Sequence, residues 1–210
     1  MSDAGSDAGP AAASLDAEDL ARANHYGLIS RLFYTPAEPN LLAEIGRLAS
    51  GIDETESAGG LVIAWRDVQD ACRGAFPVLV RQEYDRLFVG VGKAEVTPYL
   101  STYAEPGAPD RYLVRLRDRL SELGLGRRKG VFEVEDHVSG ISDVMRWLIE
   151  GGQPVAVQQL FFREFAHPGG MGFFAAVRKA ASAHFYKAIA SWAEAFYEVE
   201  RAAFEMSSGR

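Results

Sequence analysis

The residues with the clearest chemical potential lie in two stretches of the chain, 83–103 and 133–137. In the first stretch, Tyr84, Leu87 and Phe88 follow one another at spacings of three and four, which places them on one face of a helix. A loop containing prolines and tyrosines comes directly after them. An apolar helix face, rigid prolines and amphipathic tyrosines are together what a groove for an extended or helical peptide requires. The stretch therefore predicts a peptide groove, although an apolar stripe of this kind also suits an ordinary core.

The second stretch is acidic and stands at the start of a predicted helix. Glu133, Glu135 and Asp136 precede His137 there. Carboxylates favour helix N-termini, where Asp136 could act as a cap. The same carboxylates could form a rim that pairs with arginines of a ligand. The sequence leaves both interpretations open.

Two other patterns resemble chemical motifs but lack essential parts. Residues 90–93 read Gly-Val-Gly-Lys, yet a phosphate-binding loop needs glycine where Leu87 stands and Ser or Thr where Ala94 stands. Residues 164–167 form one Glu-x-x-His pair, whereas a di-iron bundle needs two such pairs and two further glutamates. Neither His-x-x-x-His nor Gly-x-Ser-x-Gly occurs. We therefore expect no catalytic residues, no metal site and no cofactor.

Composition and charge limit the partners. The 210 residues carry a formal net charge of −7, which disfavours nucleic acid and anionic lipid as general partners. Cys72 is the single cysteine, so no internal disulfide can form. No apolar run approaches the roughly 20 residues that span a bilayer, and the start of the chain lacks the features of a secretory signal. A soluble, cytoplasmic protein is expected.

The elements that must position these residues are helices, because apolar residues recur at three- and four-residue spacing and alternation is nearly absent. The pattern predicts an all-α fold, a single globular bundle of about eight or nine helices. Residues 1–14 are expected to be a disordered tail, 15–206 the helical domain and 207–210 a frayed end. Residues 90–107 are expected to be a long packed loop. The expected helices cover about 16–36, 40–49, 61–74, 77–89, 109–123, 134–150, 154–166 and 171–204, the last with a break near 182–184.

Together the two stretches resemble the TorD/DmsD family of redox-enzyme maturation chaperones, which is related to the NarJ group. The chain departs from the family pattern at Thr97, where the first of two prolines is usual, and at Leu100 and Ile141, where acidic residues are frequent. The resemblance includes Phe161-Phe162, a glycine–proline turn without the usual tryptophan, and a long final helix. It is carried by Glu83, Tyr84, Leu87, Phe88, Gly90, Pro98, Tyr99, Ser101, Tyr103, Asp136, His137 and Met145.

The resemblance implies a TorD/DmsD-like helical bundle without catalytic activity. Such a protein is a cytoplasmic chaperone for a molybdenum-containing oxidoreductase of the dimethyl sulfoxide reductase superfamily. It binds the client's N-terminal twin-arginine signal, or its unfolded catalytic subunit, until the cofactor has been inserted, and it is a monomer or homodimer. The residues expected to contact the peptide are Tyr84, Leu87, Phe88, Pro98, Tyr99, Ser101, Tyr103, Glu133, Asp136 and His137.

Two rival interpretations remain. One is a GTP-binding switch or a hydrolytic enzyme that uses Asp136 and His137, although neighbours on a helix point about 100° apart and need not converge. The other is a structural subunit of the oxidoreductase itself.

Overall fold

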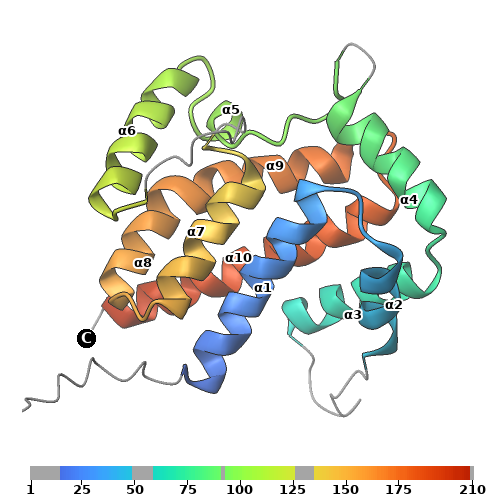
Figure 1. Ribbon diagram of the computed structural model, residues 1–210, viewed down its shortest axis with the longest axis horizontal. Coiled ribbons are helices and arrows are strands. Elements are labelled where there is room, and N and C mark those ends of the chain that lie inside the picture. The colour runs from blue at the N-terminus through green and yellow to red at the C-terminus, as the bar shows by residue number, and fades with distance from the viewer. Residues whose placement is uncertain (1–14, 49–58, 91–92, 126–134, 209–210) are drawn as a thin grey trace, which may run out of the picture.

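Helices form about three quarters of the described part of the chain (Figure 1). A computed structural model describes residues 15–48, 59–90, 93–125 and 135–208. No strand occurs within these ranges, so the expected all-α class is confirmed. Within the same ranges, no helix combines the length and the apolar character needed to cross a membrane.

The helices join into nine continuous helical segments within the described ranges, because α4 runs into η1 and α8 runs through η2 into α9. The expected number of helices is therefore confirmed. η1 and η2 are single turns of π-helix. The elements are α1 (Ala17–Tyr34), α2 (Pro39–Arg47), α3 (Gly60–Arg73), α4 (Pro77–Tyr84), η1 (Asp85–Val89), α5 (Ser101–Ala104), α6 (Pro109–Glu122), α7 (Val138–Glu150), α8 (Val155–Phe161), η2 (Phe162–Ala166), α9 (His167–Lys179) and α10 (Phe185–Ser208).

Several helices begin where local chemistry dictates. The carboxylate of Asp16 accepts a hydrogen bond of 2.7 Å from the backbone N–H of Asp19 and so caps α1. Pro39, Pro77 and Pro109 stand in the first turns of α2, α4 and α6, where proline's missing N–H costs nothing. These starts lie within two residues of the expected ones.

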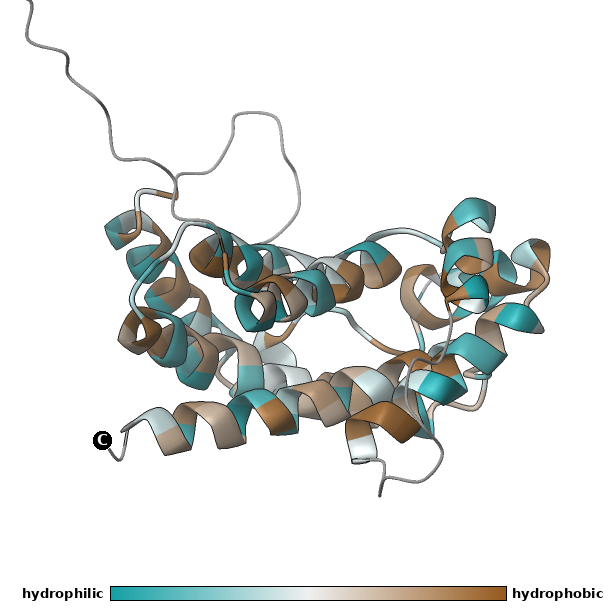
Figure 2. Ribbon diagram, turned by 90° about the horizontal axis from the view of Figure 1, so that it is seen from below, coloured by the Kyte–Doolittle hydropathy of each residue, from teal (hydrophilic) through white to brown (hydrophobic). Residues whose placement is uncertain are grey.

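The core is organised around α10, against which α9 and α3 pack, while α1 packs along α7 and α2 along α3. Hydrophilic and hydrophobic colours alternate along most helices in Figure 2, as expected of helices that each bury one face. The largest fully buried side chains are mainly aromatic and come chiefly from α1, α9 and α10. They include Tyr26, Phe33, Phe173, Phe174, Tyr186, Trp192, Phe196 and Tyr197.

The prediction of a turn between α8 and α9 is wrong, because the chain stays helical through Pro168. A proline inside an α-helix clashes with the carbonyl four residues earlier. The π-helical turn η2 ends two residues before the proline, and the N–H of His167 donates to the carbonyl of Phe162, five residues earlier. This wider turn accommodates the proline without breaking the helix. The expected break near 182–184 is confirmed, since α10 begins at Phe185.

The glycines after Pro168 allow close packing instead of making a turn. A Cβ atom at Gly169 would lie 2.6 Å from Cβ of Leu100, and one at Gly170 would lie 2.4 Å from Cε2 of Tyr197. Both distances are too short for real contacts, so these positions need glycine for the approach of α9 to α5 and α10.

The segment expected as a long packed loop, 90–107, contains the one-turn helix α5, which the sequence pattern did not reveal. Its packing is confirmed at its centre, where Leu100 is fully buried. α7 begins at Val138, and the expected tail, residues 1–14, lies outside the described residues.

Candidate functional site

The two stretches singled out in the sequence meet in space. The backbone N–H of Leu100 donates to the carbonyl of Asp136 at 2.9 Å, and the N–H of Val138 donates to the carbonyl of Pro98 at 2.9 Å. These two bonds form an isolated antiparallel bridge. The bridge fixes the aromatic loop against the start of α7, so the expected partnership between the two stretches has a backbone basis.

The bridge brings two aromatic rings together. Tyr99 and His137 are its paired residues, and their ring centroids lie 5.7 Å apart in an edge-to-face arrangement. Tyr99 is 36 % exposed, whereas His137 is 7 % exposed. Tyr99 is therefore the most accessible aromatic side chain among the predicted peptide contacts.

Asp136 is almost completely enclosed, and only one of its carboxylate oxygens is engaged. Oδ2 accepts a hydrogen bond of 3.1 Å from the backbone N–H of Ser101. Oδ1 is buried and has no hydrogen-bond partner. An unpaired buried carboxylate oxygen is costly, so Asp136 has strong acceptor capacity to offer a donor such as a guanidinium.

His137, not Asp136, caps α7. Its Nδ1 accepts a hydrogen bond of 3.2 Å from the backbone N–H of Ser139, which assigns the proton of the neutral ring to Nε2. Burial lowers the pKa of His137 to about 4, against the opposing effect of the Asp136 charge, so the ring is neutral at pH 7. The two side chains thus bond to separate backbone N–H groups, and neither orients the other as in a hydrolytic triad.

Glu83, which opens the first stretch, caps a helix far away in the sequence. Its carboxylate accepts hydrogen bonds from the backbone N–H groups of His184, Phe185 and Tyr186, at 2.8, 3.0 and 2.8 Å. These are the otherwise unpaired donors at the start of α10. Glu83 therefore joins α4 to α10 and is 5 % exposed.

The apolar stripe that follows Glu83 is enclosed. The hydroxyl of Tyr84 donates to the carbonyls of Phe33 and Tyr34, at 3.2 and 2.8 Å. It thereby satisfies two carbonyl groups at the C-terminal end of α1. Leu87 is fully buried, and Phe88 is 8 % exposed. A peptide would reach these side chains only after the surrounding helices moved, and their contact with a ligand stays a prediction.

The remaining predicted residues are divided between the loop and the undescribed segment. The hydroxyl of Tyr103 donates to the carbonyl of Thr97 at 2.8 Å, and burial raises the pKa of Tyr103 to about 12. Pro98 and Ser101 are buried beside the bridge. Glu133 lies outside the described residues.

Two arginines of α6 contact the acidic residues around the site. Arg115 pairs with Glu105 at 2.5 Å, and Arg117 lies 3.4 Å from Glu135. The sequence did not reveal these pairs. Since both arginines are about half exposed, the pairs contribute little stability and leave the carboxylates open to exchange.

The sequence also contained a signal for the role of Glu83. A glutamate next to buried apolar residues needs a partner. The partner could not be inferred, because the N-terminus of α10 is about 100 residues away and is recognised through backbone atoms. Within the described ranges, no group of three or more His, Cys, Asp or Glu side chains is placed to hold a metal ion.

Comparison with known proteins gives one result for the whole region. The family described as nitrate reductase delta subunit matches residues 60–198, about two thirds of the chain. The match begins with α3, ends within α10 and includes both stretches of the site. No curated protein matches the sequence.

Proposed function

Because this chain belongs to the nitrate reductase delta subunit family, we propose that it is a cytoplasmic chaperone that assists the assembly of a molybdenum-containing oxidoreductase. The family comprises NarJ/TorD-type maturation chaperones, so the resemblance noted in the sequence is confirmed. The client is a catalytic subunit of the dimethyl sulfoxide reductase superfamily, held until its cofactor has been inserted.

The observation that carries the proposal is the bridge between Tyr99 and His137, which lies inside the family match. The same bridge includes a backbone bond to Asp136, whose Oδ1 has no hydrogen-bond partner, and the side chain of Tyr99 is exposed. An aromatic anchor next to a buried acceptor suits a peptide in which an apolar side chain lies close to an arginine.

The ligand is the client's N-terminal segment, either a twin-arginine signal or the unfolded start of the catalytic subunit. A basic segment is favoured by the net charge of −7 and by Glu105 and Glu135, whose arginine partners are solvent-exposed and exchangeable. Ordering a flexible segment costs entropy, so the affinity is moderate, which suits later release.

Calorimetry with a peptide of the client's N-terminus tests the proposal through Tyr99→Ala. Removing an exposed aromatic anchor should weaken binding by about 1–3 kcal/mol. Phe76→Ala is the matched control, because Phe76 is a more exposed aromatic residue at the start of α4 that is not among the predicted peptide contacts. The control should bind like the wild type.

Asp136→Asn tests the acceptor. Asparagine keeps an oxygen for the N–H of Ser101 but loses the charge, so binding should weaken by about 1–3 kcal/mol. A thermal unfolding curve for each variant separates loss of binding from loss of fold. Unchanged affinity in both Tyr99→Ala and Asp136→Asn would refute the site assignment.

A structural subunit is the second candidate, favoured by the word subunit in the family's description. Purification of the mature, cofactor-loaded enzyme decides between the two: a subunit stays with it in fixed proportion, whereas a chaperone is absent. Calorimetry with GTP tests the remaining alternative, in which Asp136 and His137 serve a nucleotide.

A further inference from the structure

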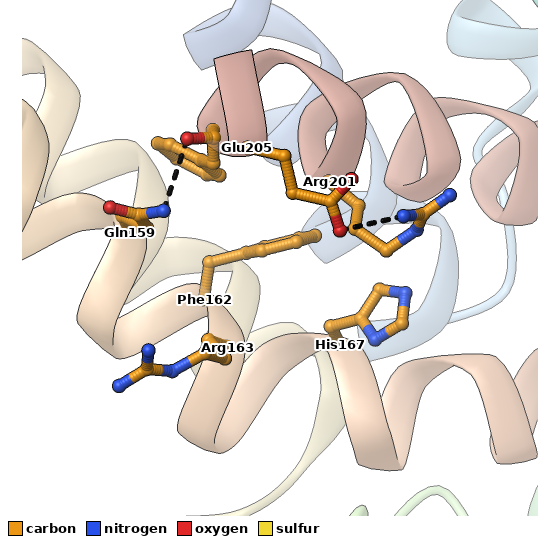
Figure 3. Close-up of a pocket in the computed structure, with 7 residues that line it drawn as sticks. Gln159, Phe162, Arg163, His167, Arg201 and Glu205 are labelled. Carbon is orange, nitrogen blue, oxygen red and sulfur yellow. Dashed lines mark hydrogen bonds and ion pairs between the residues drawn. The ribbon is translucent and has the colours of Figure 1, made fainter. Parts of the chain in front are cut away.

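A cavity of about 140 Å³ lies between η2 and the last turns of α10, and none of its lining residues belongs to either stretch of the site (Figure 3). Its apolar part is formed by the rings of Phe162 and Phe204, whose centroids lie 5.3 Å apart. Both side chains are nearly fully buried, at 2 % and 4 % exposure. The cavity therefore has a hydrophobic floor of two phenyl rings.

The other lining residues are polar, and two of them have unused hydrogen-bonding capacity. Nε2 of His167 is enclosed without a hydrogen-bond partner, 3.6 Å from Oε1 of Glu198. Arg163 is exposed and makes no hydrogen bond or ion pair within the described part of the chain. Figure 3 shows both residues on the helical segment that carries Phe162, with the side chain of Arg163 extending away from the ring of His167.

The charge of Arg201, the other arginine of the lining, is already neutralised. Arg201 donates to Oε1 of Glu205 at 2.7 Å and also pairs with Glu198 at 2.9 Å. Among the described residues, Arg163 is therefore the charged side chain of the lining that has no carboxylate partner. An occupant with a single negative charge would balance its charge.

The size of the cavity selects the apolar part of that occupant. An engineered cavity of about 150 Å³ in another protein admits benzene. Water that lies against the two phenyl rings makes no hydrogen bonds on that side, so an aromatic ring that displaces such water gains affinity. One six-membered ring is the group that fits.

We propose that this cavity binds an aromatic carboxylate, with its ring on Phe162 and Phe204 and its carboxylate at Arg163. The unpartnered Nε2 of His167 lies at the same wall. Such a ligand could be a free aromatic acid or the C-terminal aromatic residue of a polypeptide, since both present a ring next to a carboxylate.

A titration of the full chain with 4-fluorophenylacetate, followed by fluorine and amide nuclear magnetic resonance, tests the proposal. We expect saturable binding with a dissociation constant of about 1 mM or lower, with amide shifts concentrated in η2 and the end of α10. Arg163→Gln should raise the dissociation constant about tenfold by removing the charged donor. Arg31→Gln, the same change at an exposed arginine of α1, should leave it unchanged.

Two further probes test whether the ligand needs a carboxylate and whether it is a small molecule or a polypeptide. 4-Fluorobenzyl alcohol lacks the charge and should bind about tenfold more weakly than the acid. N-acetylglycyl-4-fluorophenylalanine represents a polypeptide C-terminus: tighter binding than the free acid indicates a polypeptide ligand, and weaker binding indicates a small one. The proposal is overturned if neither acid binds, if the alcohol binds equally well, or if Arg163→Gln has no effect.

Discussion

The cap that Glu83 provides to α10 gives the sharpest prediction about this fold. In Glu83→Gln, the amide oxygen can keep the two bonds that Oε1 accepts from His184 and Tyr186. The amide nitrogen then faces the buried N–H of Phe185, which loses its acceptor, 3.0 Å away, and meets a donor instead. One unsatisfied buried donor costs about 1–3 kcal/mol, and the two remaining bonds lose their charge assistance.

We therefore expect Glu83→Gln to lower the free energy of unfolding by about 2 kcal/mol, and Glu83→Ala, which removes all three bonds, by about 3–5 kcal/mol. Since a domain of this size loses about 2–4 °C of melting temperature per kcal/mol, the glutamine variant should melt about 6 °C lower. Urea unfolding followed by circular dichroism measures the change, and an unchanged slope shows that both states keep their compactness.

Glu95→Gln is the matched control, because Glu95 accepts bonds from Ala181 and Ser182 in the same inter-helix segment but is solvent-exposed. Its loss should be clearly smaller. If Glu83→Gln unfolds like the wild type, the buried cap does not stabilise α10 as argued. If the variant keeps its stability but loses peptide binding, Glu83 contacts the ligand and the capping role is refuted.

Three further changes test other parts of the structure. His137 has a pKa near 6.5 in the unfolded chain and about 4 in the folded protein, so the unfolded chain binds more protons between these pH values. The free energy of unfolding of the wild type should therefore fall by about 2 kcal/mol between pH 7.5 and 5. Urea titrations at the two pH values should not show this loss for His137→Asn. Glu200→Gln removes the charge of a buried carboxylate that accepts hydrogen bonds from two nitrogens of Arg22. It should lower the free energy of unfolding by about 3 kcal/mol in the same assay. Gly169→Ala should lower the melting temperature, since overpacking costs about 1–3 kcal/mol, whereas Gly27→Ala, which meets only the end of a flexible arginine, should be neutral or stabilising by calorimetric melting.

Helix positions were predictable because they depend on local patterns. The starts of α2, α4 and α6 follow from prolines, and the break before α10 follows from residues near 182–184. The continuity of α8 into α9 was not predictable. It depends on a π-helical turn before Pro168 and on a close approach of α9 to Leu100, both of which are set by tertiary packing.

The candidate site was predictable as two stretches but not in its internal roles. The types and spacing of residues located both stretches, and their resemblance to a family placed them together. Which residue caps α7 was not predictable, because both Asp136 and His137 can act as caps. The neighbouring loop decides between them, since the N–H of Ser101 donates to the carboxylate of Asp136 and leaves His137 to cap the helix. Glu133 lies outside the described residues, so its place in the acidic rim stays a prediction.

Burial decides which predicted contacts can be tested by mutation. Replacing Leu87, which is fully enclosed, would leave a cavity that costs about 2–5 kcal/mol, so a loss of peptide binding in that variant would report unfolding as readily as lost contact. Tyr84 presents the same difficulty, because its hydroxyl closes the end of α1. Tyr99 does not, since its side chain is exposed and its part in the bridge is made by the backbone. A peptide site that includes both the exposed Tyr99 and the buried Leu87 must open before the peptide binds. Substitutions that stabilise the closed core make this opening less frequent, so they should lower the affinity for the peptide.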